Sequence, residues 1–158
     1  MTRPSLAQAT AGFPASDAWW NAQVYGPLNW LYGQGGDEAP WVTPALNASY
    51  TGDGNSNGTP QYRVLTIAGA KFVQWRGGLN VTYTSGSPNN GGNFLNAALP
   101  TAARPLSRRT VTAACSAASS SSLSVKIDFQ TDGTVSIVVM TGVTPPWVSL
   151  NGVLYSID

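Results

Sequence analysis

The clearest pattern in the chain is a strict alternation of apolar and polar positions from residue 123 to residue 130. The apolar members share one side of the segment and are Leu123, Val125, Ile127 and Phe129. Thr131-Asp132-Gly133 follows, and a second run rich in β-branched residues extends from 134 to 141. Side chains of a strand alternate between its two faces, and Asp-Gly accepts the positive φ that a tight turn requires. The segment 123–141 is therefore predicted to be a β-hairpin with one buried face.

Other segments of strand composition are separated by loops rich in Gly, Pro, Asn and Ser. They cover residues 41–50, 62–67, 71–83, 94–95, 110–117 and 152–157. Within 71–83, Gly77-Gly78 interrupts the alternation and predicts a bulge or a close approach of the backbone. Short strands at this spacing are typical of an antiparallel sandwich. The predicted fold class is all-β, an antiparallel β-sandwich or jelly-roll-like domain with a short N-terminal α-helical segment.

The amino-terminal part follows a helical pattern. Ser16 or Asp17 is a suitable cap for a helix through Tyr25, and Pro27 is expected to break or kink it because proline cannot donate to the preceding turn. This segment is more aromatic than a short helix requires, so it either folds back on the sheet or buries its rings against another subunit. The predicted docking residues are Trp19, Trp20, Val24, Leu28, Trp30 and Leu31.

These patterns divide the chain into three parts. We predict an N-terminal docking segment at 1–33, a linker at 34–40 and a β-sandwich domain at 41–158. In the last strand of the hairpin, Val138 and Met140 lie on the side opposite the core-facing residues. An apolar outer face has to be covered by a loop or by another subunit. Val138 and Met140 are therefore the predicted oligomer interface.

Charge is scarce, with eight Lys and Arg, seven Asp and Glu, and no His. A net charge of +1 without a basic cluster predicts neither nucleic-acid binding nor an anionic membrane partner. Cys115 is the single cysteine, so no intrachain disulfide can form, and it is expected to pack as a small hydrophobe. No apolar run has the length of a membrane span, and residues 1–15 lack the apolar block of a signal peptide. We expect no membrane insertion.

The chain offers little catalytic chemistry. The absence of His excludes Ser-His-Asp and Cys-His machinery. Among the carboxylates, Asp128 is expected on the solvent side of its strand and Asp132 in a turn, so no acid–base pair is predicted. Residues 53–58 begin like a calcium loop, but the position of the final carboxylate is Val64, which favours an ordinary Asn/Gly turn. We predict no enzyme, no cofactor and no metal site.

The residues of the chain fit sugar binding better than catalysis. Aromatic faces stack on pyranose rings while amides bind the hydroxyl groups, so an exposed ring beside amides is required. Trp75 shares the apolar face of its strand and is expected in the core, whereas Tyr83 at the strand end is expected to keep its hydroxyl in solvent. The candidate ligand-binding residues are Asn80, Tyr83, Asn89 and Asn90.

The order of several motifs over residues 41–158 carries a resemblance. The motifs are Trp41 with Leu46-Asn47, Tyr62-Arg63, Lys71-Phe72-Val73 leading to Arg76-Gly77, Leu99-Pro100 with Arg104-Pro105, Ile127 to Gly133-Thr134-Val135, and Trp147 with Ser149 to Val153 and Tyr155. This order resembles the small C-terminal β-domains of phage minor tail proteins and tail fibres, particularly those of actinobacterial phages. The resemblance implies a trimeric virion component that displays a surface to the host envelope or joins neighbouring virion proteins.

The hypothesis from the sequence is therefore a non-enzymatic phage virion protein, made in the bacterial host cytoplasm and located on the virion. In its first form it is a homotrimeric minor tail or tail-tip protein that binds a cell-surface glycan. A capsid decoration protein is the alternative, and a free carbohydrate-binding module is a further one. The expected partners are copies of the chain itself, other virion proteins and the glycan.

Overall fold

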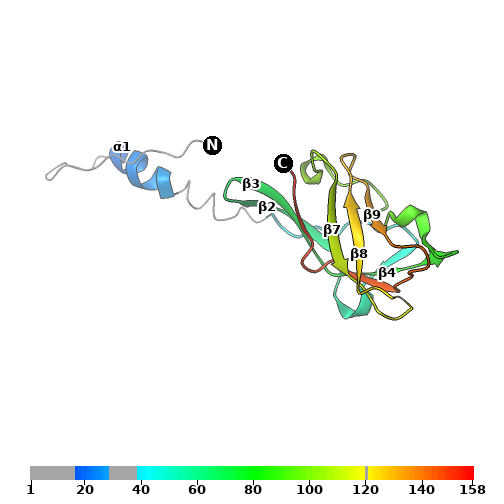
Figure 1. The fold of residues 1–158 in the computed structure, drawn as a ribbon. Helices are drawn as coiled ribbons and strands as arrows, with labels where there is room; N and C mark the ends of the chain where they lie inside the picture. The colour runs from blue at the N-terminus through cyan, green and yellow to red at the C-terminus, as the bar shows by residue number, and fades with distance from the viewer. Residues whose placement is uncertain (1–16, 29–38, 120) are drawn as a thin grey trace.

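The computed structural model describes residues 17–28, 39–119 and 121–158 (Figure 1). The helix α1, Asp17–Trp20, continues as a π-helical turn over Asn21–Tyr25 (η1), and residues 26–28 are again α-helical. The wide π turn ends at Tyr25, two positions before Pro27, whose missing N–H cannot complete the regular helical ladder. The helix does not break at Pro27, because residues 26–28 are α-helical, and a kink there stays a prediction.

The rest of the described chain consists of short strands and single 3₁₀ turns. The strands are β1 Tyr50–Gly52, β2 Gln61–Ile67, β3 Ala70–Arg76, β4 Gly78–Val81, β5 Tyr83–Thr84, β6 Ser87–Pro88, β7 Arg109–Ala114, β8 Ser124–Phe129, β9 Val135–Val138, β10 Trp147–Ser149 and β11 Leu154–Ser156. The 3₁₀ turns are η2 Gly54–Ser56, η3 Asn89–Gly92 and η4 Thr101–Ala103. The predicted all-β fold is confirmed.

The strands form small antiparallel sheets around one core. Their orders are β11-β3-β2, β1-β4-β10 and β7-β8-β9, with β5-β6 as a separate hairpin. The core joins them through aromatic contacts, because the Trp75 ring of β3 lies 6.0 Å from the Phe129 ring of β8 and 5.9 Å from that of Phe94. Trp75 is buried, which confirms its predicted place in the core.

The predicted hairpin at 123–141 is present as β8 and β9. Ile127 pairs with Ile137 and Phe129 with Val135, and Gly133 has φ +90° in the connecting turn. The Gln130 N–H donates to the Thr134 carbonyl at 2.9 Å and closes the turn. One detail of the prediction is wrong: Leu123 is exposed, and it lies just before β8, which begins at Ser124.

The predicted strand over 41–50 is also wrong. Only Val42 and Leu46 form isolated bridges, to Tyr62 and Leu95, and continuous pairing begins at Tyr50. Pro44 lies in the middle of this segment and has no N–H to donate to a ladder. The short strands β6 and β10 were not predicted, because two or three residues between turns show no period.

Gly77 and Gly78 form the corner at which the chain passes from one sheet to the next. β3, which ends at Arg76, belongs to the β11-β3-β2 sheet, and β4, which begins at Gly78, belongs to the β1-β4-β10 sheet. A Cβ on Gly77 would lie 2.2 Å from the Thr59 carbonyl oxygen, and one on Gly78 would lie 2.5 Å from the Gly54 carbonyl oxygen. The predicted close approach of the backbone is confirmed, and it folds the turn η2 tightly against this corner.

Candidate functional site

The predicted docking residues are described only in part. Trp20 is 53% exposed, Leu28 is exposed, and Val24 is partly buried. The side chain of Trp19 is not described, and Trp30 and Leu31 lie outside the described residues. Docking through this segment stays a prediction. No helix within residues 17–28, 39–119 and 121–158 is both long and apolar enough to cross a membrane.

Val138 and Met140 lie on the outer face of the β7-β8-β9 sheet, where they are 38% and 65% exposed. The register places Val138 opposite Lys126, which in turn pairs with Thr112 of β7. These side chains and Val143 line a shallow depression of about 380 Å³. The surface combines apolar groups with one cation, and its role as an oligomer interface stays a prediction.

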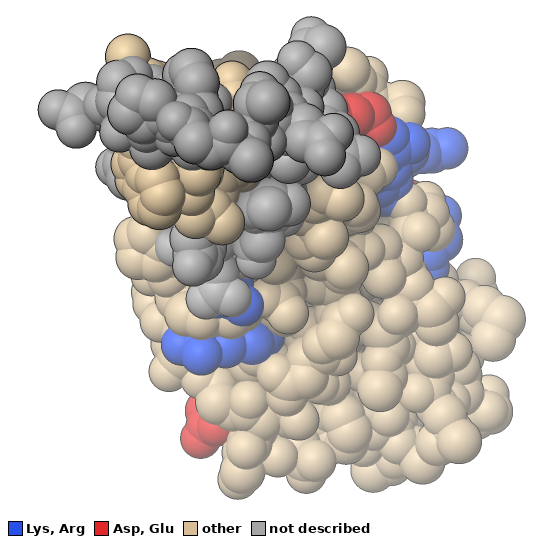
Figure 2. Space-filling view, turned by 90° about the vertical axis from the view of Figure 1, so that its left-hand side faces the viewer, with Lys and Arg blue, Asp and Glu red and all other residues tan. Residues whose placement is uncertain are grey.

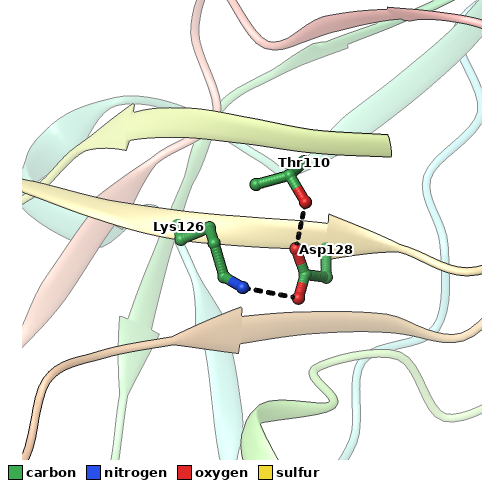
Figure 3. Close-up of polar contacts among 3 residues, drawn as sticks. All are labelled: Thr110, Lys126 and Asp128. Carbon is green, nitrogen blue, oxygen red and sulfur yellow. Dashed lines mark hydrogen bonds and ion pairs between the residues drawn. The ribbon is translucent and has the colours of Figure 1, made fainter. Parts of the chain in front are cut away.

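Asp128 lies on the same outer face but is only 5% exposed, so its predicted solvent position is wrong. Thr110 Oγ1 donates to Asp128 Oδ1 at 2.6 Å, and Lys126 Nζ lies 3.0 Å from Oδ2 (Figure 3). Burial by itself raises the pKa of this carboxyl, but the Thr110 hydrogen bond, Lys126 and the charge of Arg108 together lower the pKa below its ordinary value. The alternation does place Asp128 on the outer face, but this polar side chain is buried there between β7 and β9.

The carboxylates of Asp53 and Asp132 are engaged in turns. Asp53 Oδ1 accepts from the Gly58 N–H at 3.0 Å, and Asp132 Oδ1 accepts from the Thr134 N–H at 2.8 Å. The segment that begins like a calcium loop therefore folds as a turn that its own carboxylate closes. Within the described residues, no group of three or more His, Cys, Asp and Glu is placed to hold a metal ion.

The predicted sugar-binding residues use their polar groups internally. The Tyr83 hydroxyl, expected in solvent, donates to the Pro145 carbonyl at 2.9 Å, and burial raises its pKa. The Asn80 amide donates to Thr51 and Gly52.

The two asparagines of η3 hold their own loop together. Asn89 donates to Thr82 and accepts from Thr84. Asn90 adopts a left-handed φ of +54° and donates to the Asn93 carbonyl. Ligand binding by Asn80, Tyr83, Asn89 and Asn90 stays a prediction, and each of these residues also makes a hydrogen bond within the fold.

A different set of amides surrounds a polar pocket at the Gly77 corner. The pocket has a volume of about 290 Å³, near the lower limit of ligand-binding clefts, and we call it the corner pocket. It is lined by Asn57, Gly58, Thr59, Gln61, Arg76, Gly77 and Asn151. These residues come from the loop after η2, from β2 and β3, from the corner between β3 and β4, and from the turn between β10 and β11.

Arg76 is the one charged residue among the described residues that line the corner pocket. Its guanidinium lies 4.1 Å from the centroid of the half-buried Trp41 ring, and the Arg63 guanidinium lies 4.5 Å from the same centroid. Arg76 Nε and Nη2 both donate to Gln61 Oε1, at 2.9 and 2.6 Å. The stacking and the double hydrogen bond hold an exposed cation in one orientation. On the face that Figure 2 displays, charged groups are few and most of the surface is uncharged.

The sequence carried no signal for this pocket. Trp41 and Arg76 are named only within the motifs of the resemblance, and Asn57 and Asn151 lie 94 positions apart. The tight turn η2 and the Gly77 corner bring them together, and both depend on pairing between distant segments.

Comparison with known proteins gives one structural match. No protein-family model matches the chain, and no curated protein matches it. The fold does have a counterpart among solved structures. It is similar to the receptor binding protein of Listeria phage PSA, with a TM-score of 0.57 and 14% sequence identity over 85% of this chain and 72% of that chain. At this identity the match shows a shared fold.

Proposed function

We propose that the chain is a non-enzymatic virion protein of a bacteriophage and that it binds the surface of the host cell. The observation that carries this proposal is the fold, which 85% of the chain shares with a phage receptor binding protein. The corner pocket adds a site with the chemistry that recognition of a hydroxyl-rich ligand requires, namely several fixed amides and one oriented cation.

In this proposal the exposed residues of the N-terminal helix, Trp20 and Leu28 among them, attach the chain to other virion proteins. The outer face with Val138 and Met140 joins copies of the chain into a trimer. Each copy then contributes one weak contact to the host envelope, and several copies acting together give firm attachment. The position favoured on the virion is the tail tip.

Cell binding tests the attachment role. We expect the fluorescently labelled chain to bind cells of the bacterium that the encoding phage infects, and an excess of unlabelled chain to slow adsorption of that phage. The adsorption of an unrelated phage to the same cells serves as the control and should not change. A chain that neither binds these cells nor slows adsorption would contradict the proposal. Antibody labelling of the phage head instead of the tail would favour capsid decoration, and free polysaccharide binding without virion incorporation would favour a carbohydrate-binding module.

The assembly prediction concerns the outer face of β9. Light scattering coupled to size exclusion should give a particle of three times 16.5 kDa. The double variant Val138→Thr, Met140→Gln keeps the size of both side chains but removes their apolar character, so it should run mainly as the monomer.

Leu106→Gln is the matched control, since it alters a highly exposed leucine outside the β9 face and should leave the trimer intact. A wild-type chain that stays monomeric at high concentration would refute the assembly model. Loss of the trimer in the Leu106 variant would instead place the interface elsewhere.

A further inference from the structure

We infer that the corner pocket binds an anionic sugar residue, with Arg76 binding its carboxylate or phosphate group and the surrounding amides binding its hydroxyls. This inference rests on the proposed function and adds the place of the site and the chemistry of its ligand. The predicted ligand-binding residues at Asn80, Tyr83, Asn89 and Asn90 play no part in it.

The first argument is the orientation of Arg76. Two of its N–H groups donate to Gln61 Oε1, and its Cζ atom lies over the Trp41 ring, 4.1 Å from the centroid. A guanidinium has five N–H donors, so the contacts to described residues leave the Nη1 donors for a ligand. A cation held in one orientation loses little entropy on binding and forms paired hydrogen bonds with a carboxylate or a phosphate.

The second argument is the state of the amides. Asn151 Oδ1 accepts from the Gly77 N–H at 2.9 Å, and its Nδ2 donates to Asn57 Oδ1 at 3.4 Å. Asn57 Nδ2 donates to the Gly54 carbonyl at 2.7 Å, and Gln61 Nε2 donates to Thr43 at 2.9 Å.

Each of these amide nitrogens carries two hydrogens, so one hydrogen on each stays available after its internal bond. The amides are therefore held in place and each still has a hydrogen to donate, as a site that binds hydroxyl groups requires.

The third argument is the rigidity of the base of the pocket. Gly77 is buried, and its backbone and that of Gly78 contact Thr59 and Gly54 so closely that no side chain would fit. The Gly78 N–H donates to the Gly58 carbonyl at 2.9 Å, and the Leu150 N–H donates to the Gly77 carbonyl at 2.8 Å. The pocket is thus built on paired backbone from three segments.

The charge of the lining selects the class of sugar. None of the described lining residues is acidic, and Arg76 contributes a positive charge. A neutral sugar would leave this cation without a counterion, whereas a uronic acid or a sugar phosphate would supply one. The hydroxyl groups of the ring would then reach Thr59 and the amides.

Two-dimensional NMR of the isotope-labelled full chain tests the inference. Glucuronic acid and glucose 1-phosphate are the two anionic probes, which separate a carboxylate from a phosphate, and glucose and inorganic phosphate are the references. We expect one anionic sugar to shift the Gly58 and Gly77 amide signals saturably and to bind at least about tenfold more tightly than glucose or phosphate alone. Equal binding of glucose, equal binding of inorganic phosphate, or the absence of any shift would overturn the inference.

Variants locate the site. Arg76→Gln should weaken binding at least about tenfold, and Arg76→Lys, which keeps the charge but loses the planar fork, should weaken it less. Lys71→Gln is the matched control, because it removes one positive charge from an exposed position on the same strand β3 outside the pocket, and it should bind as the wild type does.

The same variants separate this inference from the proposed function. If Arg76→Gln binds host cells as well as the wild type does, the pocket assignment is wrong and the attachment role stands. If the wild type does not bind host cells, the attachment role is wrong. If Arg76→Gln does not fold, the pocket assignment is tested by comparing sugar binding of Arg76→Lys with that of the wild type. Binding of Arg76→Lys as tight as that of the wild type would overturn the assignment.

Discussion

Replacement of Gly77 by alanine is expected to lower the free energy of unfolding by at least about 3 kcal/mol. The residue has φ +94°, and an added Cβ would lie 2.2 Å from the Thr59 carbonyl oxygen and 2.7 Å from the Pro60 nitrogen. These are backbone atoms that a rotamer change cannot move away, so the corner between β3 and β4 would have to open. Urea denaturation followed by tryptophan fluorescence measures the loss.

Gly58→Ala is the control that isolates the steric contribution. Gly58 has nearly the same φ, +91°, but a Cβ at this position would meet nothing within 4 Å. Only the conformational strain of alanine at positive φ remains, which costs about 1 kcal/mol. If the two variants lose equal stability, the close approach at Gly77 does not limit the fold. Since the Gly77 corner supports Arg76 and Asn151, any folded Gly77→Ala protein should also lose pocket binding.

Asp128→Asn is expected to lower the free energy of unfolding at pH 7 by about 2 kcal/mol. The buried carboxylate accepts a 2.6 Å hydrogen bond from Thr110 and lies 3.0 Å from Lys126 Nζ. An asparagine oxygen still accepts from Thr110, but the charge that Lys126 faces is lost. Thr110→Val, which removes only the hydroxyl, should lose a smaller amount, about 1 kcal/mol.

The stability lost in Asp128→Asn should be larger at neutral pH than at acidic pH. The pKa of Asp128 is lowered in the folded protein, so its contribution is present above the ordinary aspartate pKa of about 4 and is lost as the pH falls through the lower folded value. Urea denaturation at pH 7 and at pH 2 to 3 should show the difference between wild type and Asp128→Asn shrinking at the acidic end. A difference that stays constant over this range would mean that the charge of Asp128 does not stabilise the fold.

The corner pocket and the fold have a common origin. Gly77 ends β3 directly after Arg76, and the change of sheet turns the chain toward η2 and the turn that contains Asn151. A straight strand through this position would leave Arg76 and Gln61 on an open sheet face. The bend therefore provides a concave surface next to Arg76, the one cation among the described residues that line the pocket.

The sequence by itself determined the features that follow from local rules. Alternation with period two predicted the β8–β9 hairpin and the all-β fold, and Thr131-Asp132-Gly133 predicted its turn. The pair Gly77-Gly78 predicted a close backbone approach, since glycine is required where a Cβ has no room. The apolar face of 71–83 likewise placed Trp75 in the core. Each of these inferences needs only neighbouring residues.

The tertiary structure alone decided what depends on pairing between distant segments. The alternation correctly put Asp128 on the outer face, but the register with Thr110 and Ser136, rather than the strand itself, made it buried. Tyr83 was expected in solvent, but its hydroxyl meets Pro145, 62 positions away. The corner pocket needs Asn57, Arg76 and Asn151 together, and no local pattern relates them. Periodicity reports which face a side chain takes, whereas packing decides what covers that face.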